Sequence, residues 1–206
     1  MKTGRVIRSM RIVPREEFMP EQLKGYASVD TPFPIGCGQT ISAPHMVAMM
    51  NEALELEVGQ RVLEVGAGSG YHAATIAEVV APSDGDPKHW GHVYTVEIVQ
   101  ELIDRVKKNL SRIGYADRVT VICADGSKGY PEKAPYDRIL VTAASPEIPE
   151  PLMEQLKVGG VMAIPVGWHF SQDLMVIRKL PKGEVQRRRL CPVMFVPLRG
   201  ELGFKE

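Results

Sequence analysis

Residues 62–70 decide the fold: Val62-Leu63-Glu64-Val65-Gly66-Ala67-Gly68-Ser69-Gly70, an apolar run that breaks into alternating glycines. A helical pattern follows at once, so the stretch predicts a strand, a tight turn and the start of a helix. Glycine at three alternate positions permits positive φ angles and lets a ligand lie directly against the backbone. The nucleotide-binding turn of doubly wound α/β folds is usually written G-x-G-x-x-G, whereas this chain has G-x-G-x-G. A purely structural turn is therefore an open alternative.

Strand-like and helix-like segments alternate from residue 61 onward. β-rich runs cover 62–65, 93–96, 119–123, 138–141 and 161–164, and helical runs cover 71–80, 98–113 and 150–157. The apolar residues of 98–113 recur every three or four positions, which indicates a face buried in the core. Gly159 and Gly160 are expected to end the helix at 150–157. Alternating βα units predict an α/β fold with a mostly parallel, doubly wound sheet.

The two ends of the chain depart from this alternation. Runs at 174–180 and 185–190 flank Pro181-Lys182-Gly183-Glu184, which predicts an antiparallel C-terminal edge hairpin. Helical fragments around 15–26 predict a small cap over the sheet. We therefore expect a single domain over 1–206, with an N-terminal cap and substrate or cofactor loop at 1–60 and a cofactor-binding core at 61–206.

Composition restricts the classes of partner. The 206 residues, of which 44% are hydrophobic, suit one domain, and 25 basic residues balance 25 acidic ones. This balance gives no sign of a strong hold on nucleic acid or on a membrane surface, and the one basic cluster, Arg187 to Arg189, is expected at the surface. No stretch approaches the ~18 apolar residues of a membrane helix, and no secretory signal is expected at the start of the chain.

Cysteines and histidines are sparse. The three cysteines are widely spaced and form no C-x-x-C pair: Cys37, Cys123 and Cys191. This pattern fits neither a disulfide framework nor a zinc site, and it predicts a reducing, cytoplasmic location. Three histidines lie fairly close in sequence without ligand spacing, and we interpret them as surface residues: His72, His89 and His92. We predict no metal.

Acidic residues follow two later strands. Glu97 ends the strand at 93–96, and Asp125 with Gly126 follows the strand at 119–123. Ligands of open α/β sheets collect at the carboxyl ends of the strands, so Glu97 is expected to bind a ribose diol and Asp125 an adenine amine. Either residue alone could be a surface carboxylate. Together with the glycine turn they favour a cofactor site.

The spacing of these residues distinguishes two cofactors. A dinucleotide turn needs its third glycine one position later and an acidic residue about 20 residues further on. Gly70 is early for that pattern and Glu97 is late. S-adenosylmethionine carries no phosphate, so its turn serves close contact with the methionine part. The spacing therefore favours S-adenosylmethionine over a nicotinamide dinucleotide.

The segment before the glycines carries the most specific signal, D-T-P-F-P-I-G-C-G-Q-T-I-S-A-P-H-M at 30–46. It closely resembles the signature of protein-L-isoaspartate O-methyltransferases. The resemblance runs from about Val6 to Leu198 through E-V-G-A-G-S-G, V-Y-T-V-E, A-D-G, Y-D-R-I-L-V-T-A-A and F-V-P-L. It implies a Rossmann-like methyltransferase sheet and an enzyme that transfers a methyl group from S-adenosylmethionine to the free carboxylate of isoaspartyl residues in damaged proteins. The resulting ester collapses to succinimide, which reopens partly to normal aspartate.

The resemblance also implies roles for individual residues. Ser42 is placed at the active site, with Thr40 and Ile41 beside cofactor and substrate, and Val196 to Leu198 near the pocket mouth. The implied cofactor contacts are Thr40, Ile41, Glu64, Gly66, Ala67, Gly68, Ser69, Gly70, Glu97, Asp125, Gly126 and Thr142. Thr142, Ala143 and Ala144 would line the floor beneath the reacting methyl group. Two features depart from many members: Cys37 replaces an aromatic residue, and a shorter N-terminus implies a reduced substrate-covering helix.

Ser42 has a second interpretation, because it precedes Pro44 and a helical apolar run and so suits a helix N-cap. The sequence alone favours the cap, whereas the resemblance favours a shared role in which the hydroxyl orients the substrate carboxylate. His45 is expected to be structural, because methylation of an ionised carboxylate needs no strong base. Three alternatives stay open: methyl transfer to a small molecule or nucleic acid, a binding domain without turnover, and a nicotinamide-dependent dehydrogenase.

Overall fold

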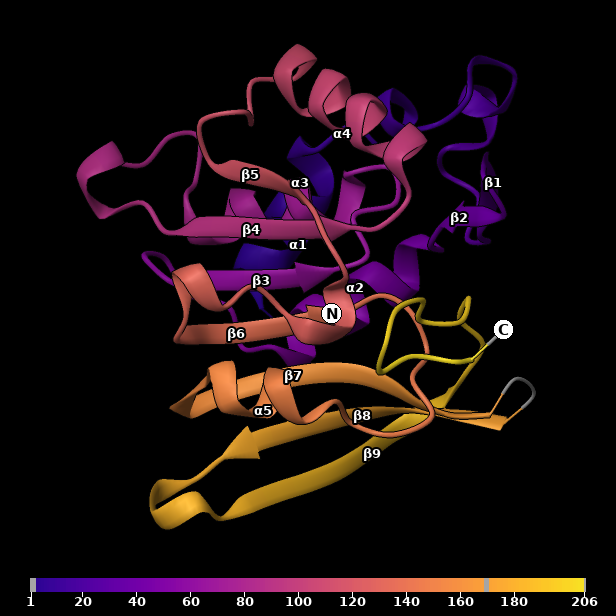
Figure 1. Cartoon of the computed structure of the whole chain (residues 1–206). Coiled ribbons are helices and arrows are strands. Elements are labelled where there is room, and N and C mark those ends of the chain that lie inside the picture. The colour runs from indigo at the N-terminus through magenta and orange to yellow at the C-terminus, as the bar shows by residue number, and fades with distance from the viewer. Residues whose placement is uncertain (1–2, 169–170, 206) are drawn as a thin grey trace.

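A seven-stranded sheet forms the centre of the computed structural model, which describes residues 3–168 and 171–205 (Figure 1). The strand order is β5-β4-β3-β6-β7-β8-β9. The strands are β3 (Arg61–Val65), β4 (His92–Glu97), β5 (Val119–Cys123), β6 (Tyr136–Val141), β7 (Leu156–Trp168), β8 (Ser171–Lys179) and β9 (Val185–Val193). Strands β3 to β7 pair in parallel, and β8 and β9 are antiparallel at one edge. This topology confirms the predicted doubly wound sheet with a C-terminal edge hairpin.

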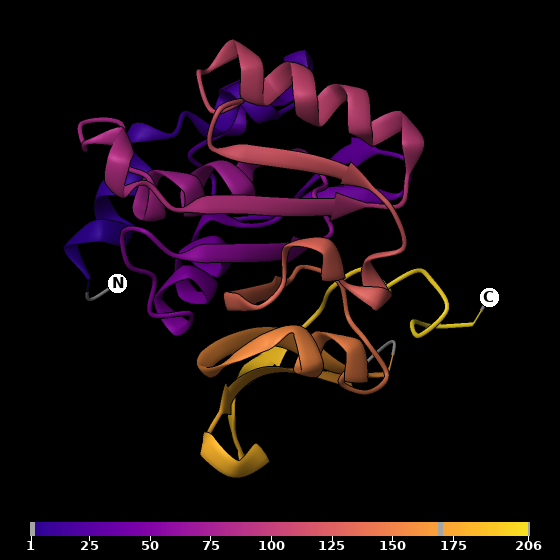
Figure 2. The ribbon, with the colours of Figure 1, turned by 60° about the vertical axis from the view of Figure 1, so that its left-hand side comes forward.

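Helices cover both faces of the sheet: α1 (Gly4–Ile12), α2 (Pro44–Ala53), α3 (Tyr71–Val80), α4 (Gln100–Arg112) and α5 (Glu150–Gln155). Figure 1 shows α5 in front of the sheet and α1 to α3 behind it, and Figure 2 shows α4 beside β5. Successive residues of β3 enter different cores, because side chains alternate along a strand. Val62 packs in the cluster that contains the residues of α3 and α4, whereas Leu63 and Val65 pack in the cluster on the α5 side.

The predicted helix at 98–113 is confirmed as α4. Its apolar stripe is buried, and Leu102, Val106 and Leu110 belong to the core cluster behind the sheet. The predicted helix end at Gly159 and Gly160 is wrong, because α5 stops at Gln155 and both glycines lie inside the long strand β7. Gly159 has φ +83°, and the β6–β7 register shifts nearby, so the glycine pair belongs to a strand irregularity instead of a helix cap.

The N-terminal segment contains more structure than its sequence indicates. Helix α1 was not predicted, and the fragments at 15–26 are two short 3-10 helices, η1 (Arg15–Phe18) and η2 (Glu21–Tyr26). A two-stranded hairpin follows, formed by β1 (Phe33–Gly36) and β2 (Gln39–Ile41). The buried guanidinium of Arg15 donates hydrogen bonds to backbone carbonyls between Ala27 and Thr31 and to that of Ser42. Arg15 therefore connects the N-terminal segment through hydrogen bonds to the loop that leads into α2.

Candidate active site

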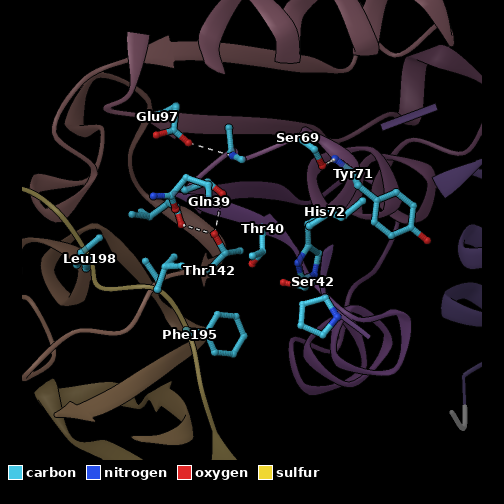
Figure 3. Close-up of a pocket in the computed structure, with 18 of the residues that line it drawn as sticks. Gln39, Thr40, Ser42, Ser69, Tyr71, His72, Glu97, Thr142, Phe195 and Leu198 are labelled. Atoms are coloured by element: carbon cyan, nitrogen blue, oxygen red, sulfur yellow. Dashed lines mark hydrogen bonds between the residues drawn. The ribbon is translucent and has the colours of Figure 1, made fainter. Parts of the chain in front are cut away.

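A cavity of about 510 Å³ lies at the carboxyl ends of β3, β4 and β6 (Figure 3). The strand order reverses at β3, because β4 and β5 lie on one side of it and β6 and β7 on the other. Ligands of open α/β sheets bind at this point. The lining includes ten of the predicted site residues: Thr40, Ile41, Ser42, Gly66, Ala67, Gly68, Ser69, Glu97, Gly126 and Thr142. The run Val196 to Leu198 also lines it, as predicted for the pocket mouth. Three predicted cofactor contacts lie outside the lining: Glu64, Gly70 and Asp125.

The glycine turn needs its glycines for two different reasons. Gly66 has φ +95°, and a Cβ there would lie 2.4 Å from the hydroxyl oxygen of Thr142. That hydroxyl donates to the Gly66 carbonyl at 2.7 Å, so the absence of a side chain lets β6 support the turn from below. Gly70 has φ +89°, and a Cβ there would lie 3.2 Å from a methyl carbon of Val106 on α4. Gly66 therefore shapes the cavity floor, whereas Gly70 permits helix packing behind it.

Glu97 organises the wall of the cavity next to the turn. Its side chain is almost fully buried. One carboxylate oxygen accepts a hydrogen bond from the Gly68 N–H at 3.0 Å, and the other accepts from the N–H groups of Ile98 and Val99, also at 3.0 Å. A carboxylate has about four acceptor positions, so one is left for a ligand. Glu97 thus also stabilises the backbone around the cavity, a role that its sequence position does not indicate.

Glu64 lies on β3, outside the lining of the cavity. It is fully buried on β3, where one oxygen accepts a hydrogen bond from the Thr95 hydroxyl at 2.5 Å and the other has no partner among the described residues. Burial raises the pKa of Glu64 to about 8, and the negative charge of Glu97 contributes to the rise. The carboxyl group is therefore protonated at neutral pH, and direct cofactor contact is not supported by its position.

Asp125 binds the C-terminal segment. Its carboxylate accepts hydrogen bonds from the N–H and hydroxyl of Ser127 and from the N–H of Glu201. Desolvation acts to raise its pKa, but these hydrogen bonds outweigh that effect and leave the pKa below its usual value. Ala144 holds the same segment through two backbone hydrogen bonds, one donated to the Val196 carbonyl and one accepted from the Leu198 N–H. Asp125 therefore helps to keep residues 196–198 against the cavity.

The prediction that Ser42 caps a helix is wrong. The N-cap residue of α2 is Ala43, and Pro44 at the first helical position has no N–H to satisfy. Asp30 supplies the cap from a distant segment, because its carboxylate accepts from the His45 backbone N–H at 2.9 Å. The same oxygen lies 2.9 Å from the His45 ring nitrogen, so Asp30 holds the ring at the start of α2, beside the cavity that His45 also lines. The Ser42 hydroxyl lines the cavity and has no hydrogen-bond partner among residues 3–168 and 171–205.

His72 was misinterpreted as a surface residue. It is 7% exposed, lies in the first turn of α3 and lines the cavity, whereas His89 is exposed and His92 is half-buried. Its Nε2 atom lies 3.0 Å from the Asn51 side-chain oxygen. The position was available from the sequence, because residue 72 follows the last glycine by two and a first-turn side chain can return toward the turn. Metal-ligand spacing, the criterion applied to histidines, could not detect it.

The described part of the chain contains no cluster of three metal-ligating side chains. Among the same residues, no helix is long and apolar enough to cross a membrane. The three cysteines are free thiols, and Arg187 to Arg189 are exposed on β9, as expected.

Comparisons with known proteins agree with this geometry. Residues 1–203 match the family described as protein-L-isoaspartate(D-aspartate) O-methyltransferase. A protein-L-isoaspartate O-methyltransferase from Hyperthermus butylicus is 60% identical over all of this chain and 86% of its own length. The corresponding protein of Staphylothermus marinus is 55% identical over all of this chain and 91% of its own length.

Solved structures give the same result. One protein-L-isoaspartate O-methyltransferase has a TM-score of 0.84 at 31% identity, over 98% of this chain and 63% of that longer chain. A Plasmodium falciparum protein described by the same activity, in complex with S-adenosyl-L-homocysteine, has a TM-score of 0.82 at 28% identity over 97% of this chain and 92% of its own. With the family match spanning almost the whole sequence, the chain belongs to the protein-L-isoaspartate(D-aspartate) O-methyltransferase family.

Proposed function

We propose that this protein is a repair enzyme that transfers a methyl group from S-adenosylmethionine to the free carboxylate of L-isoaspartyl residues in damaged proteins and peptides. The observation that carries the proposal is the family match over residues 1–203, joined to a cavity lined by the signature residues 40–42 and the glycine turn. The product is a methyl ester that collapses to succinimide. The expected substrate is thus a polypeptide, and nucleic acid, membrane and metal are not expected partners.

The cavity fits the proposed cofactor in size and chemistry. A volume of about 510 Å³ lies within the range of small-molecule sites. Gly66 and Gly68 leave the backbone of the turn bare, and Glu97 retains an acceptor position for a ribose hydroxyl. Gly126 lies under the same space, where a side chain would collide with Val65. We assign the methionine part to residues 66–69 and the adenosine to Glu97 and Gly126.

Ser42 is the residue we assign to the substrate carboxylate. When bound, the cofactor supplies an activated sulfonium methyl group. The isoaspartyl carboxylate, with a reference pKa near 4, is ionised at neutral pH and needs no base. The protein must chiefly hold the reacting groups in line, and such positioning can supply several kcal/mol. The Ser42 hydroxyl, which has no partner among the described residues, can donate to the carboxylate oxygen that does not attack.

We also infer the organisation and location of the protein. The residues of 1–60 pack on the same sheet as 61–206, which supports a single methyltransferase domain with an N-terminal cap and a cofactor-binding core. Three free cysteines support a reducing compartment, and we infer the cytoplasm.

The test compares two peptides that differ only in an aspartyl or isoaspartyl linkage, incubated with methyl-labelled S-adenosylmethionine. We expect base-labile label on the isoaspartyl peptide alone, because an ester of that carboxylate hydrolyses readily. Equal labelling of both peptides, or label that survives mild base, would remove this function. Labelled small molecules or nucleic acid in place of the peptide would favour the other acceptor classes.

A further inference from the structure

A buried network of hydrogen bonds fixes the tautomer of the His72 imidazole. Thr75 donates its hydroxyl hydrogen to the His72 carbonyl at 2.8 Å, so its oxygen must accept from the Asn51 amide nitrogen at 3.1 Å. This orients the Asn51 amide and leaves its oxygen facing His72 Nε2 at 3.0 Å. An amide oxygen can only accept, so the Nε2 atom carries the hydrogen.

The other ring nitrogen is consequently a bare acceptor. Burial lowers the pKa of His72 to about 3, so the ring is neutral throughout the physiological range. Nδ1 then has a lone pair and no hydrogen. It has no hydrogen-bond partner within residues 3–168 and 171–205, although the residue is more than nine-tenths buried. Figure 3 shows the ring between the glycine turn and Ser42, in the cavity that His72 lines.

The position of this acceptor selects one group of the cofactor. An amino-acid moiety held over residues 66–69 presents both a carboxylate and an ammonium. The N-terminus of α3, whose first residue is Tyr71, favours the negative carboxylate. The ammonium needs acceptors, and Glu97, the buried carboxylate of the lining, is already engaged by the N–H groups of Gly68, Ile98 and Val99. A neutral imidazole with a free lone pair meets that need without attracting the carboxylate.

We propose that His72 Nδ1 accepts a hydrogen bond from the α-ammonium group of the bound cofactor, with Asn51 and Thr75 as positioning residues that hold the required tautomer. This inference rests on the proposed function, since it assumes an adenosylmethionine-type ligand over the glycine turn. The signature residues imply other contacts with the cofactor, and His72 on α3 would add one to them.

Binding of three ligands tests the contact by isothermal titration calorimetry. S-adenosylhomocysteine and decarboxylated S-adenosylmethionine both carry the ammonium, whereas methylthioadenosine lacks it. We expect His72→Leu to weaken the first two by about tenfold, the size of one hydrogen bond to a charged group, and to leave methylthioadenosine within about twofold. The exposed residue His89 provides the matched control, and His89→Leu should bind all three as the wild type does.

An equal loss for all three ligands, or no loss for any, would overturn the contact. Wild-type protein that binds none of them would instead refute the proposed cofactor, so the two failures are distinguishable. If His72→Leu does not fold, nitrogen NMR of the wild type decides. The Nδ1 signal should move on addition of S-adenosylhomocysteine and not of methylthioadenosine, and an unmoved signal at saturation would overturn the contact.

Discussion

The two ends of helix α3 treat buried polar groups in opposite ways. At its C-terminal end the carboxylate of Glu78 is 1% exposed and accepts from Ser83, Tyr115 and Arg118, with Arg8 at 3.2 Å. At its N-terminal end His72 presents an acceptor to the cavity, and the Ser42 hydroxyl nearby has no partner among the described residues. The comparison indicates two kinds of buried polar group. A closed network, in which the groups bind one another, stabilises the fold, whereas open groups, which have no protein partner and face a cavity, are available to bind a ligand.

The closed end is built around a second buried charge. The guanidinium of Arg118 lies 4.0 Å from the ring centre of Tyr115 and 5.1 Å from that of Trp90, and it also donates to the carbonyls of Ala81 and Gly114. Its packing therefore depends on neighbours from several segments. Removing Glu78 would leave this cation buried with only neutral partners and the exposed Asp117.

The largest expected effect is at this closed end. Glu78→Leu should lower the free energy of unfolding by about 3 to 5 kcal/mol, the usual cost of breaking one partner out of a buried ion pair. Methyl transfer measured well below the melting temperature should change little, because Glu78 lies outside the cavity lining. Denaturant unfolding gives the first quantity, and the exposed pair of Arg5 and Glu57 supplies the control, since Glu57→Gln should cost at most about 1 kcal/mol. Comparable losses in the two variants would contradict the distinction.

Glu64 should make stability depend on pH. An unfolded glutamate loses its proton near pH 4.5, whereas the buried carboxyl retains it to about pH 8. Between these values the folded state binds more protons, so wild-type stability falls as pH rises, by about 1.4 kcal/mol per unit from this group. Glu64→Gln lacks the ionisable group and should gain about 3 kcal/mol relative to wild type between pH 5 and pH 7. If the free energy of unfolding had the same pH dependence in the two proteins over that range, Glu64 would not titrate as described.

Glu97 both binds backbone N–H groups of the fold and faces the cavity. Because both carboxylate oxygens accept backbone N–H groups, Glu97→Ala and Glu97→Gln should each cost stability, so cofactor affinity is compared on protein that is shown to be folded. Glu97→Gln should weaken S-adenosylmethionine binding by about 1.5 to 3 kcal/mol, the range for hydrogen bonds to a charged group. Calorimetry measures this, with the exposed Glu101→Gln on α4 as control. Unchanged affinity in a folded Glu97→Gln protein would place the ribose elsewhere.

Much of the fold was predictable from residues that act locally. The glycine turn, the stripe of α4 and the turn at Pro181 to Gly183 each determine their element through backbone geometry or periodicity, and each prediction is confirmed. Gly159 and Gly160 misled because a positive φ serves a strand irregularity as well as a helix end. Pairing with β6 decides between the two, and pairing is a long-range contact that no local pattern records.

The site was predictable as a set of positions but not in its internal bonding. Asp30 caps α2 from 15 residues away in sequence, which removes the capping role that Ser42 suggests. Glu64 belongs to the same motif as the glycines, yet its alternation along β3 directs it away from the cavity. The position of His72 two residues after the last glycine was visible in the sequence, but its contact with Asn51 on α2 leaves no local signal. Each error concerns a tertiary contact.

Ser42 and Asp30 provide the sharpest contrast between an open and a closed polar group. Both belong to the signature segment, but the Ser42 hydroxyl faces the cavity, whereas the Asp30 carboxylate is bound to the end of α2. Asp30→Ala should lower the free energy of unfolding because it removes this cap, with a smaller effect on methyl transfer. Ser42→Ala should leave stability near wild type, because the residue caps nothing.

The most direct measurement of the central claim is therefore the rate of methyl transfer by Ser42→Ala to an isoaspartyl peptide, taken with its unfolding curve and its affinity for S-adenosylmethionine. We predict a loss of tenfold or more in kcat/KM for the peptide, about 1.4 kcal/mol of barrier, with cofactor affinity and unfolding midpoint unchanged. Normal transfer by a folded Ser42→Ala protein would contradict the claim that the open hydroxyl serves the reaction.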